Sequence, residues 1–152
     1  MRKMLAVALV GSLAVVGAAR SQDDAVKKER EKFQGTWQVV SSEEDTVATP
    51  EIIVNFLKIA IKGDQLTLKG VEDLQKKFGK VTIVIDPATT PKIIDFKIED
   101  GSEKNKTFEG IYELKDDMLK ICASVRDGNR PEEFKTKAGS NRVLFVLKRE
   151  KN

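Results

Sequence analysis

The sequence predicts an all-β fold, an antiparallel up-and-down barrel of eight strands preceded by a short helix. Short runs of alternating apolar and polar residues occupy most of the chain after Gly35. Polar turns such as Gly63-Asp64 join successive runs, without the helices that parallel crossover connections require. An open sandwich would satisfy the same alternation, but closure into a barrel removes the exposed edges of a sheet.

A helix is expected first, over residues 23–34. Asp23 and Asp24 stand at its start, where the helix dipole favours acidic side chains, and Val26 and Phe33 are its apolar anchors. The eight strands follow, each with one apolar face. Their expected ranges are 36–41, 57–62, 66–69, 81–85, 94–98, 108–114, 119–125 and 143–149.

Two segments between these strands are expected to be helical. In residues 49–56, Pro50 at a first helical position favours a short helix over an early strand. In residues 71–78, Leu74 and Phe78 are four residues apart among charged side chains, which is typical of a surface helix.

The first 19 residues have the parts of a secretory signal peptide. Residues 2–3 are basic, residues 4–16 form an apolar core, and small residues precede a cleavage site after Ala19, with cleavage after Ser21 as the alternative. The core has about 13 residues, fewer than the roughly 20 that span a bilayer, which disfavours an uncleaved anchor. We therefore expect an exported protein, periplasmic or extracellular, with no stable membrane span after cleavage.

The charge balance argues against nucleic acid as a partner. The whole chain has 27 basic and 24 acidic residues, a formal charge of +3. Cleavage after Ala19 removes Arg2 and Lys3, which leaves 25 basic residues against 24 acidic ones, and cleavage after Ser21 also removes Arg20. A near-neutral mature protein lacks the basic surface that drives non-specific binding to DNA or RNA.

Residues 23–150 are expected to form a single domain. A chain of about 130 residues buries roughly two thirds of its unfolded surface, so disulfide bonds are not required for a stable core. Cys122 is the single cysteine, which excludes an internal disulfide. We favour a small, semi-buried strand residue over a free reactive thiol or an intermolecular link, and alternation places it on the outward face.

A Gly-x-Trp pattern, Gly35 and Trp37, opens the first expected strand. It is similar to the signature of lipocalins, in which the Trp packs at the closed end of the barrel against a basic residue from the last strand. The resemblance implies a structural role for both residues. It also implies Arg149, or else Arg142, as the partner in a cation–aromatic contact.

Further segments extend the resemblance over nearly the whole mature chain. They are KFQGTWQVVS at 32–41, IDP at 85–87, PKIID at 91–95, GIYEL at 110–114, LKIC at 119–122, RPEEF at 130–134 and LKRE at 147–150. In this order and spacing they resemble the uncharacterised lipocalin-like domain found in many copies in planctomycete bacteria. The resemblance implies a lipocalin-like barrel and supplies no reaction, cofactor or ligand. Residues 49–56 form an insert that departs from the family pattern.

The sequence provides little support for catalysis. It contains no histidine, which excludes Ser-His-Asp, Cys-His and HExxH mechanisms. GxSxG, P-loop and GxGxxG motifs are also missing from it. We predict no catalytic residue, metal site or cofactor. A Ser-Lys or paired-carboxylate enzyme is the alternative, with Asp86 and Asp95 as its best acid pair, although Asp86 before Pro87 is better explained as a turn former.

Four residues are candidates for binding a ligand. Tyr112 offers an apolar ring with a polar tip, although a place in the core would also explain it. Arg126, Arg130 and Arg142 bracket a long polar loop and could receive a carboxylate or phosphate head group. Their acidic neighbours favour ordinary surface pairing instead.

The function predicted from these observations is non-enzymatic binding. The expected inward faces are almost wholly Ile, Leu, Val and Phe, so a bound molecule would be small and apolar or amphipathic. The alternative is an envelope interaction or structural module with a filled barrel, whose outer face or loops contact another protein. A void of about 300 Å³ or more with a polar mouth would favour the ligand.

Overall fold

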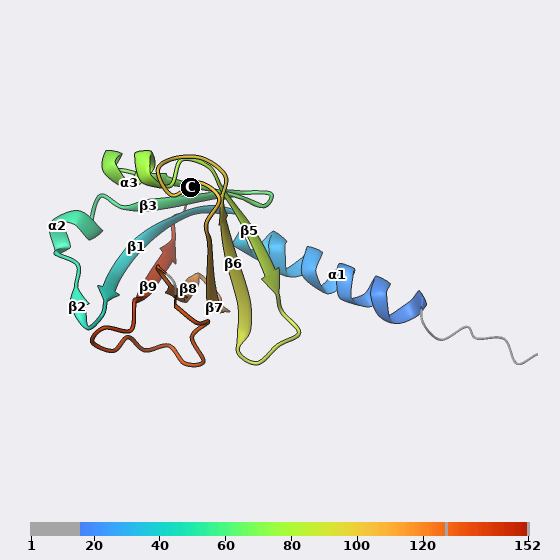
Figure 1. Ribbon diagram of the computed structural model, residues 1–152. Coiled ribbons are helices and arrows are strands. Elements are labelled where there is room, and N and C mark those ends of the chain that lie inside the picture. The colour runs from blue at the N-terminus through green and yellow to red at the C-terminus, as the bar shows by residue number, and fades with distance from the viewer. Residues whose placement is uncertain (1–15, 127, 152) are drawn as a thin grey trace, which may run out of the picture.

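A computed structural model describes residues 16–126 and 128–151, so most of the predicted signal peptide, residues 1–15, lies outside the described residues. The described part contains helices α1 (Val16–Phe33), α2 (Glu51–Val54) and α3 (Glu72–Lys77) and nine strands (Figure 1). The strands are β1 (Gly35–Glu44), β2 (Val47–Ala48), β3 (Lys58–Lys62), β4 (Gln65–Lys69), β5 (Val81–Asp86), β6 (Lys92–Ile98), β7 (Thr107–Lys115), β8 (Met118–Ser124) and β9 (Arg142–Arg149).

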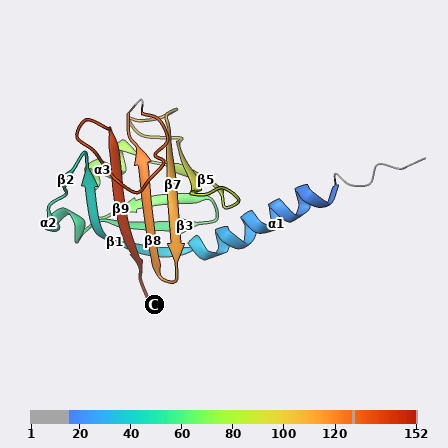
Figure 2. The same cartoon turned by 90° about the horizontal axis from the view of Figure 1, so that it is seen from below.

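Eight of the strands described form a closed antiparallel barrel. Strands β1 and β3 to β9 follow one another around the sheet, and β9 pairs back with β1 from Trp37 opposite Arg149 to Glu44 opposite Val143. Strands β1, β9, β8 and β7 lie side by side in Figure 2. The predicted up-and-down barrel is confirmed, and the open sandwich is excluded. Strand β2 was not predicted and pairs only with the end of β1.

Side-chain alternation places the core inside this barrel. Val81, Ile83 and Ile85 of β5 are buried, whereas Val84 between them is 40% exposed on the outside. One part of the wall has few backbone contacts, because β4 and β5 pair at Gln65 opposite Thr82 and at Leu66 opposite Val81, with one more bond from the Ile83 N–H to the Asp64 carbonyl just before β4. Helix α3 connects these two strands and contacts β4.

Helix α1 begins earlier than predicted, at Val16 instead of Asp23. Its C-terminal part packs on the barrel through Val26 and Phe33, and its N-terminal part leads away from the barrel in both ribbon views (Figures 1 and 2). The helical predictions at α2 and α3 are confirmed, with Pro50 directly before α2. Within residues 16–126 and 128–151, none of the helices has the length and apolar character needed to cross a membrane.

The loop between β8 and β9 covers part of the outer face of the barrel. Arg130 from this loop bonds the Asp95 carboxylate of β6 at 2.6 Å and the Gly110 carbonyl of β7 at 2.9 Å. Under the loop, Ile111 and Cys122 lie opposite each other on neighbouring strands and are 1% and 0% exposed. Cys122 therefore lies on the outer face, as alternation predicts, but it is fully buried and not semi-buried.

Candidate functional site

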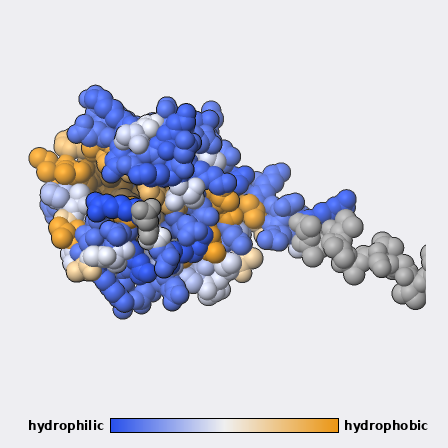
Figure 3. All heavy atoms as spheres, viewed as in Figure 1, coloured by the Kyte–Doolittle hydropathy of each residue, from blue (hydrophilic) through white to orange (hydrophobic). Residues whose placement is uncertain are grey.

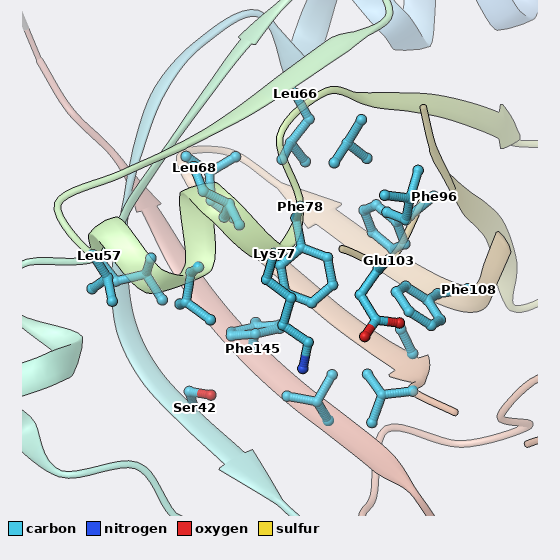
Figure 4. A pocket seen from close by; sticks show the side chains of 18 of the residues that line it. Ser42, Leu57, Leu66, Leu68, Lys77, Phe78, Phe96, Glu103, Phe108 and Phe145 are labelled. Carbon is cyan, nitrogen blue, oxygen red and sulfur yellow. The ribbon is translucent and has the colours of Figure 1, made fainter. Parts of the chain in front are cut away.

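The barrel contains a cavity of about 680 Å³ at one end. Strand β1 shows which end, because Trp37 near its start is fully buried at the α1 end, whereas Ser42 and Glu44 near its finish border the cavity. Helices α2 and α3 flank the opening. Large apolar side chains line the wall, and those labelled in Figure 4 are Leu57, Leu66, Leu68, Phe78, Phe96, Phe108 and Phe145.

The wall is largely aromatic and aliphatic. Phe78, directly after α3, packs edge to face on Phe108 of β7, with ring centres 6.0 Å apart. Deeper side chains such as Ile59 and Ile121 are buried and also border the cavity. A cavity of this volume and composition is typical of sites for small apolar molecules.

Charged residues surround the mouth. Three are basic and three acidic, so the mouth is polar while the interior is apolar. In the space-filling view, hydrophobic atoms are visible in a hollow bordered by hydrophilic ones (Figure 3). The six charged residues that border the cavity are Lys77, Lys106, Arg126, Glu44, Asp73 and Glu103.

The loop of residues 99–106 is fastened to the end of α3. The backbone N–H of Ser102 donates to the Lys76 carbonyl at 3.3 Å, and that of Glu103 donates to the Lys77 carbonyl at 3.1 Å. Gly101 allows this approach, since it has a φ of 89° and a Cβ there would lie 2.6 Å from the Lys77 carbonyl oxygen. These contacts hold Lys77 and Glu103 next to each other at the mouth (Figure 4).

Positive charge is concentrated around Glu103. A hydrogen bond from Lys106, at 2.5 Å, lowers the pKa of Glu103 below its ordinary value, and the charges of Lys77 and Arg126 lower it further. Arg126 also lies 3.6 Å from Glu44. The Glu103 carboxylate is therefore ionised at neutral pH and faces three cations.

An apolar surface adjoins this mouth on α2. Ile53 borders the cavity and is itself 41% exposed. On either side of it in the sequence, Ile52 and Phe56 are 70% and 62% exposed. Apolar surface therefore continues from the cavity to the outside of the molecule.

The opposite end of the barrel is closed by Trp37 and Arg149. The Arg149 guanidinium lies 4.2 Å from the centre of the Trp37 ring, and the indole N–H donates to the Phe33 carbonyl at 2.9 Å. Gly35 has a φ of 118°, a conformation that glycine adopts readily. The Arg142 side chain is not the one that contacts Trp37 in the described structure.

Tyr112 lies at this closed end and does not border the cavity. Its hydroxyl donates to Glu29 of α1 at 3.0 Å, and its ring packs edge to face on Phe33 with centres 5.0 Å apart. Burial raises the pKa of Tyr112, and the nearby Glu29 charge raises it further. Glu29 also accepts hydrogen bonds from Lys92 at 2.7 Å and Lys32 at 3.1 Å. The candidate role of Tyr112 in ligand binding is therefore not supported by its position.

The three candidate arginines do not form one site. Arg126 is at the cavity mouth, whereas Arg130 is paired on the outer face. Arg142 begins β9 and does not border the cavity. Only Arg126 is therefore placed to meet a molecule in the barrel.

The two candidate acids, Asp86 and Asp95, each have another partner. Asp86 lies opposite Ile93 and accepts a hydrogen bond from the Ala88 N–H at 3.0 Å, as expected of a turn former. Asp95 lies opposite Val84 and pairs with Arg130. In the part of the chain that the structure describes, no group of three His, Cys, Asp or Glu side chains could hold a metal ion.

Sequence reasoning missed Lys77, Lys106 and Glu103 at the mouth. The amphipathic pattern of residues 71–78 was the available signal for Lys77. Residues 99–106 have no such pattern, and their approach to α3 depends on Gly101 and on backbone hydrogen bonds.

A scan against protein-family models, a search of curated proteins and a search of solved structures each found no match for this chain.

Proposed function

We propose that this protein binds a small apolar or amphipathic molecule in the barrel cavity, without catalysing a reaction on it. The supporting observation is the cavity of about 680 Å³, which has an apolar wall and a charged mouth. It exceeds the void of about 300 Å³ at which ligand sites begin. The alternative of a protein-interaction module rests on a filled barrel, and this cavity favours the ligand over it.

We also propose that the protein is exported and belongs to the lipocalin-like family that its segments resemble. Cleavage after Ala19 or Ser21 would fall within the part of α1 that leads away from the barrel. The residues through which α1 contacts the barrel, Val26, Glu29 and Phe33, would remain in the mature chain. The mass of the denatured protein recovered from its own cells tests export, because it distinguishes the full chain from the two cleaved forms.

Binding is tested by titrating the protein with a neutral apolar fluorophore such as N-phenylnaphthylamine. We expect fluorescence to rise with saturation in the wild type and to be lost in Ala123→Phe, because Ala123 borders the cavity and a phenyl ring there would fill part of it. Val84→Phe is the matched control, since it adds the same ring on the outer face. Unsaturable fluorescence, or equal binding by all three proteins, would argue against a ligand in the barrel.

A further inference from the structure

We propose that the molecule bound in the cavity is an anionic amphiphile, such as a long-chain carboxylate, and that Lys77 holds its head group at the mouth. This inference rests on the proposed function. It goes further by naming the charge of the ligand and the residue that recognises it.

Lys77 lies at the mouth of the cavity. It ends α3 and borders the cavity, and the Glu103 N–H bonded to its carbonyl at 3.1 Å holds this end of the helix against the 99–106 loop. Its ammonium lies 5.2 Å from the centre of the Phe78 ring. A charged group and an apolar wall residue are therefore adjacent in the chain and in space (Figure 4).

Two of the three cations at the mouth are paired with carboxylates. Lys106 is paired with Glu103 at 2.5 Å, and Arg126 is 3.6 Å from Glu44. Among the described residues, Lys77 has no carboxylate within ion-pair distance. Its three N–H donors are therefore available to an incoming acceptor.

The charges around Lys77 determine which head group it can hold. Lys77, Lys106 and Arg126 all act on Glu103, but Arg126 also pairs with Glu44, so the mouth as a whole has three cations and three carboxylates. Asp73, the third carboxylate, lies four residues before Lys77 on the same face of α3 but is outside ion-pair distance of it. With Glu103 and Glu44 each paired to a cation, the unpaired Lys77 ammonium is the group that attracts a carboxylate, and it repels an ammonium head group.

The position of Phe78 sets the orientation of the bound molecule. Phe78 follows Lys77 directly, and its ring meets Phe108 on the far wall. A head group at Lys77 would therefore leave the attached chain to lie among these rings, with its charge outside the apolar interior. This arrangement avoids the cost of burying an unpaired charge.

The test uses three probes with chains of equal length and different head groups: palmitate, palmityl alcohol and cetyltrimethylammonium. Each probe is titrated against the bound neutral fluorophore, at concentrations below micelle formation, and its affinity is measured from the loss of fluorescence. We expect palmitate to bind about tenfold more tightly than the alcohol, with the ammonium compound weakest. Added salt should weaken palmitate binding and leave the alcohol unchanged.

The role of Lys77 is tested with Lys77→Met, which keeps an unbranched side chain and removes the charge. We expect this variant to bind palmitate about fivefold more weakly and the alcohol as the wild type does. Lys76→Met is the matched control, because Lys76 precedes it on α3 and pairs with Glu72 at 2.8 Å. Lys76→Met should leave all three affinities unchanged.

The outcomes separate the two proposals. If none of the three probes displaces the fluorophore and the fluorophore itself does not bind, the proposed function fails. If the probes bind equally, or the ammonium compound binds best, the cavity is a binding site but the anionic head group is wrong. If palmitate is preferred and Lys77→Met does not reduce that preference, the assignment to Lys77 is wrong.

Discussion

The guanidinium of Arg149 lies 4.2 Å from the centre of the Trp37 ring and donates hydrogen bonds to the carbonyl oxygens of Gln34 and Lys32, each at 2.5 Å. The Trp37 indole in turn donates to the Phe33 carbonyl. The last strand, the first strand and the end of α1 are therefore joined at one place. This junction closes the end of the barrel that lies opposite the cavity.

Trp37→Ala is expected to lower the free energy of unfolding by about 3 to 5 kcal/mol, the usual cost of truncating a large core aromatic side chain. Trp37 is 0% exposed, so its removal would leave a void that the rigid barrel cannot fill. Urea unfolding followed by circular dichroism measures the change. A loss below about 1 kcal/mol would show that the ring is not part of the core.

Arg149→Met is expected to destabilise the protein by about 1 to 3 kcal/mol, because it removes the contact with Trp37 and the bonds to two carbonyls. Arg149→Lys is the informative companion variant. It keeps the charge but lacks the planar fork of donors, so it should recover less than half of the loss. Full recovery by Lys would mean that charge alone accounts for the effect.

Stability should fall in acid because of Glu29. Burial raises its pKa, but hydrogen bonds from Lys92, Lys32 and Tyr112 outweigh burial and bring the pKa below the ordinary value of 4.5. A carboxylate with a lowered folded-state pKa stabilises the protein above its unfolded pKa. That stabilisation is lost as the pH falls through the folded-state value.

Unfolding measured at a series of pH values from neutral to acid tests this expectation. Glu29→Gln should be less stable than the wild type at neutral pH, and the difference should shrink as the pH falls below 4.5. Glu31→Gln is the control on the same helix, since Glu31 is exposed. A constant difference across the series would contradict the role given to the Glu29 charge.

Cys122 is expected to react slowly with thiol reagents in the folded protein. It is 0% exposed, and burial raises the pKa of its thiol, so that little thiolate forms at neutral pH. Reaction with Ellman's reagent should become fast only in denaturant. Rapid reaction of the native wild type would show that the covering loop is open in solution.

Arg130→Met should speed this reaction without unfolding the barrel, because Arg130 fastens the covering loop to Asp95 and to the Gly110 carbonyl. Lys137→Met is the control, since Lys137 is in the same loop and its side chain is 70% exposed. Thiol reactivity and the circular dichroism spectrum are measured together. Equal rates for wild type and Arg130→Met would remove the proposed role of this ion pair.

The barrel could be predicted because alternation along each strand is a local signal. Ile83 and Val84, for example, are neighbours in sequence and lie on opposite faces as expected. Pro50 indicated the start of α2 for an equally local reason. Strand β2 has two residues, too few to form an alternating pattern, so it was missed.

Depth along the barrel could not be predicted from alternation. Phe108 and Tyr112 share the inward face of β7, yet Phe108 borders the cavity while Tyr112 bonds Glu29 at the closed end. The burial of part of the outer face by the loop between β8 and β9 could not be predicted from alternation either. Cys122 is buried by a loop that follows it in the chain, and such tertiary contacts leave no period in the sequence.

Above all, we propose that the cavity holds a small molecule. A native mass spectrum of the protein recovered from the cells that make it, compared with its denatured mass, tests this claim most directly. We predict a discrete extra mass that is present only in the native spectrum and is absent from Ala123→Phe. A native mass equal to that of the polypeptide alone, in both wild type and Ala123→Phe, would contradict the claim.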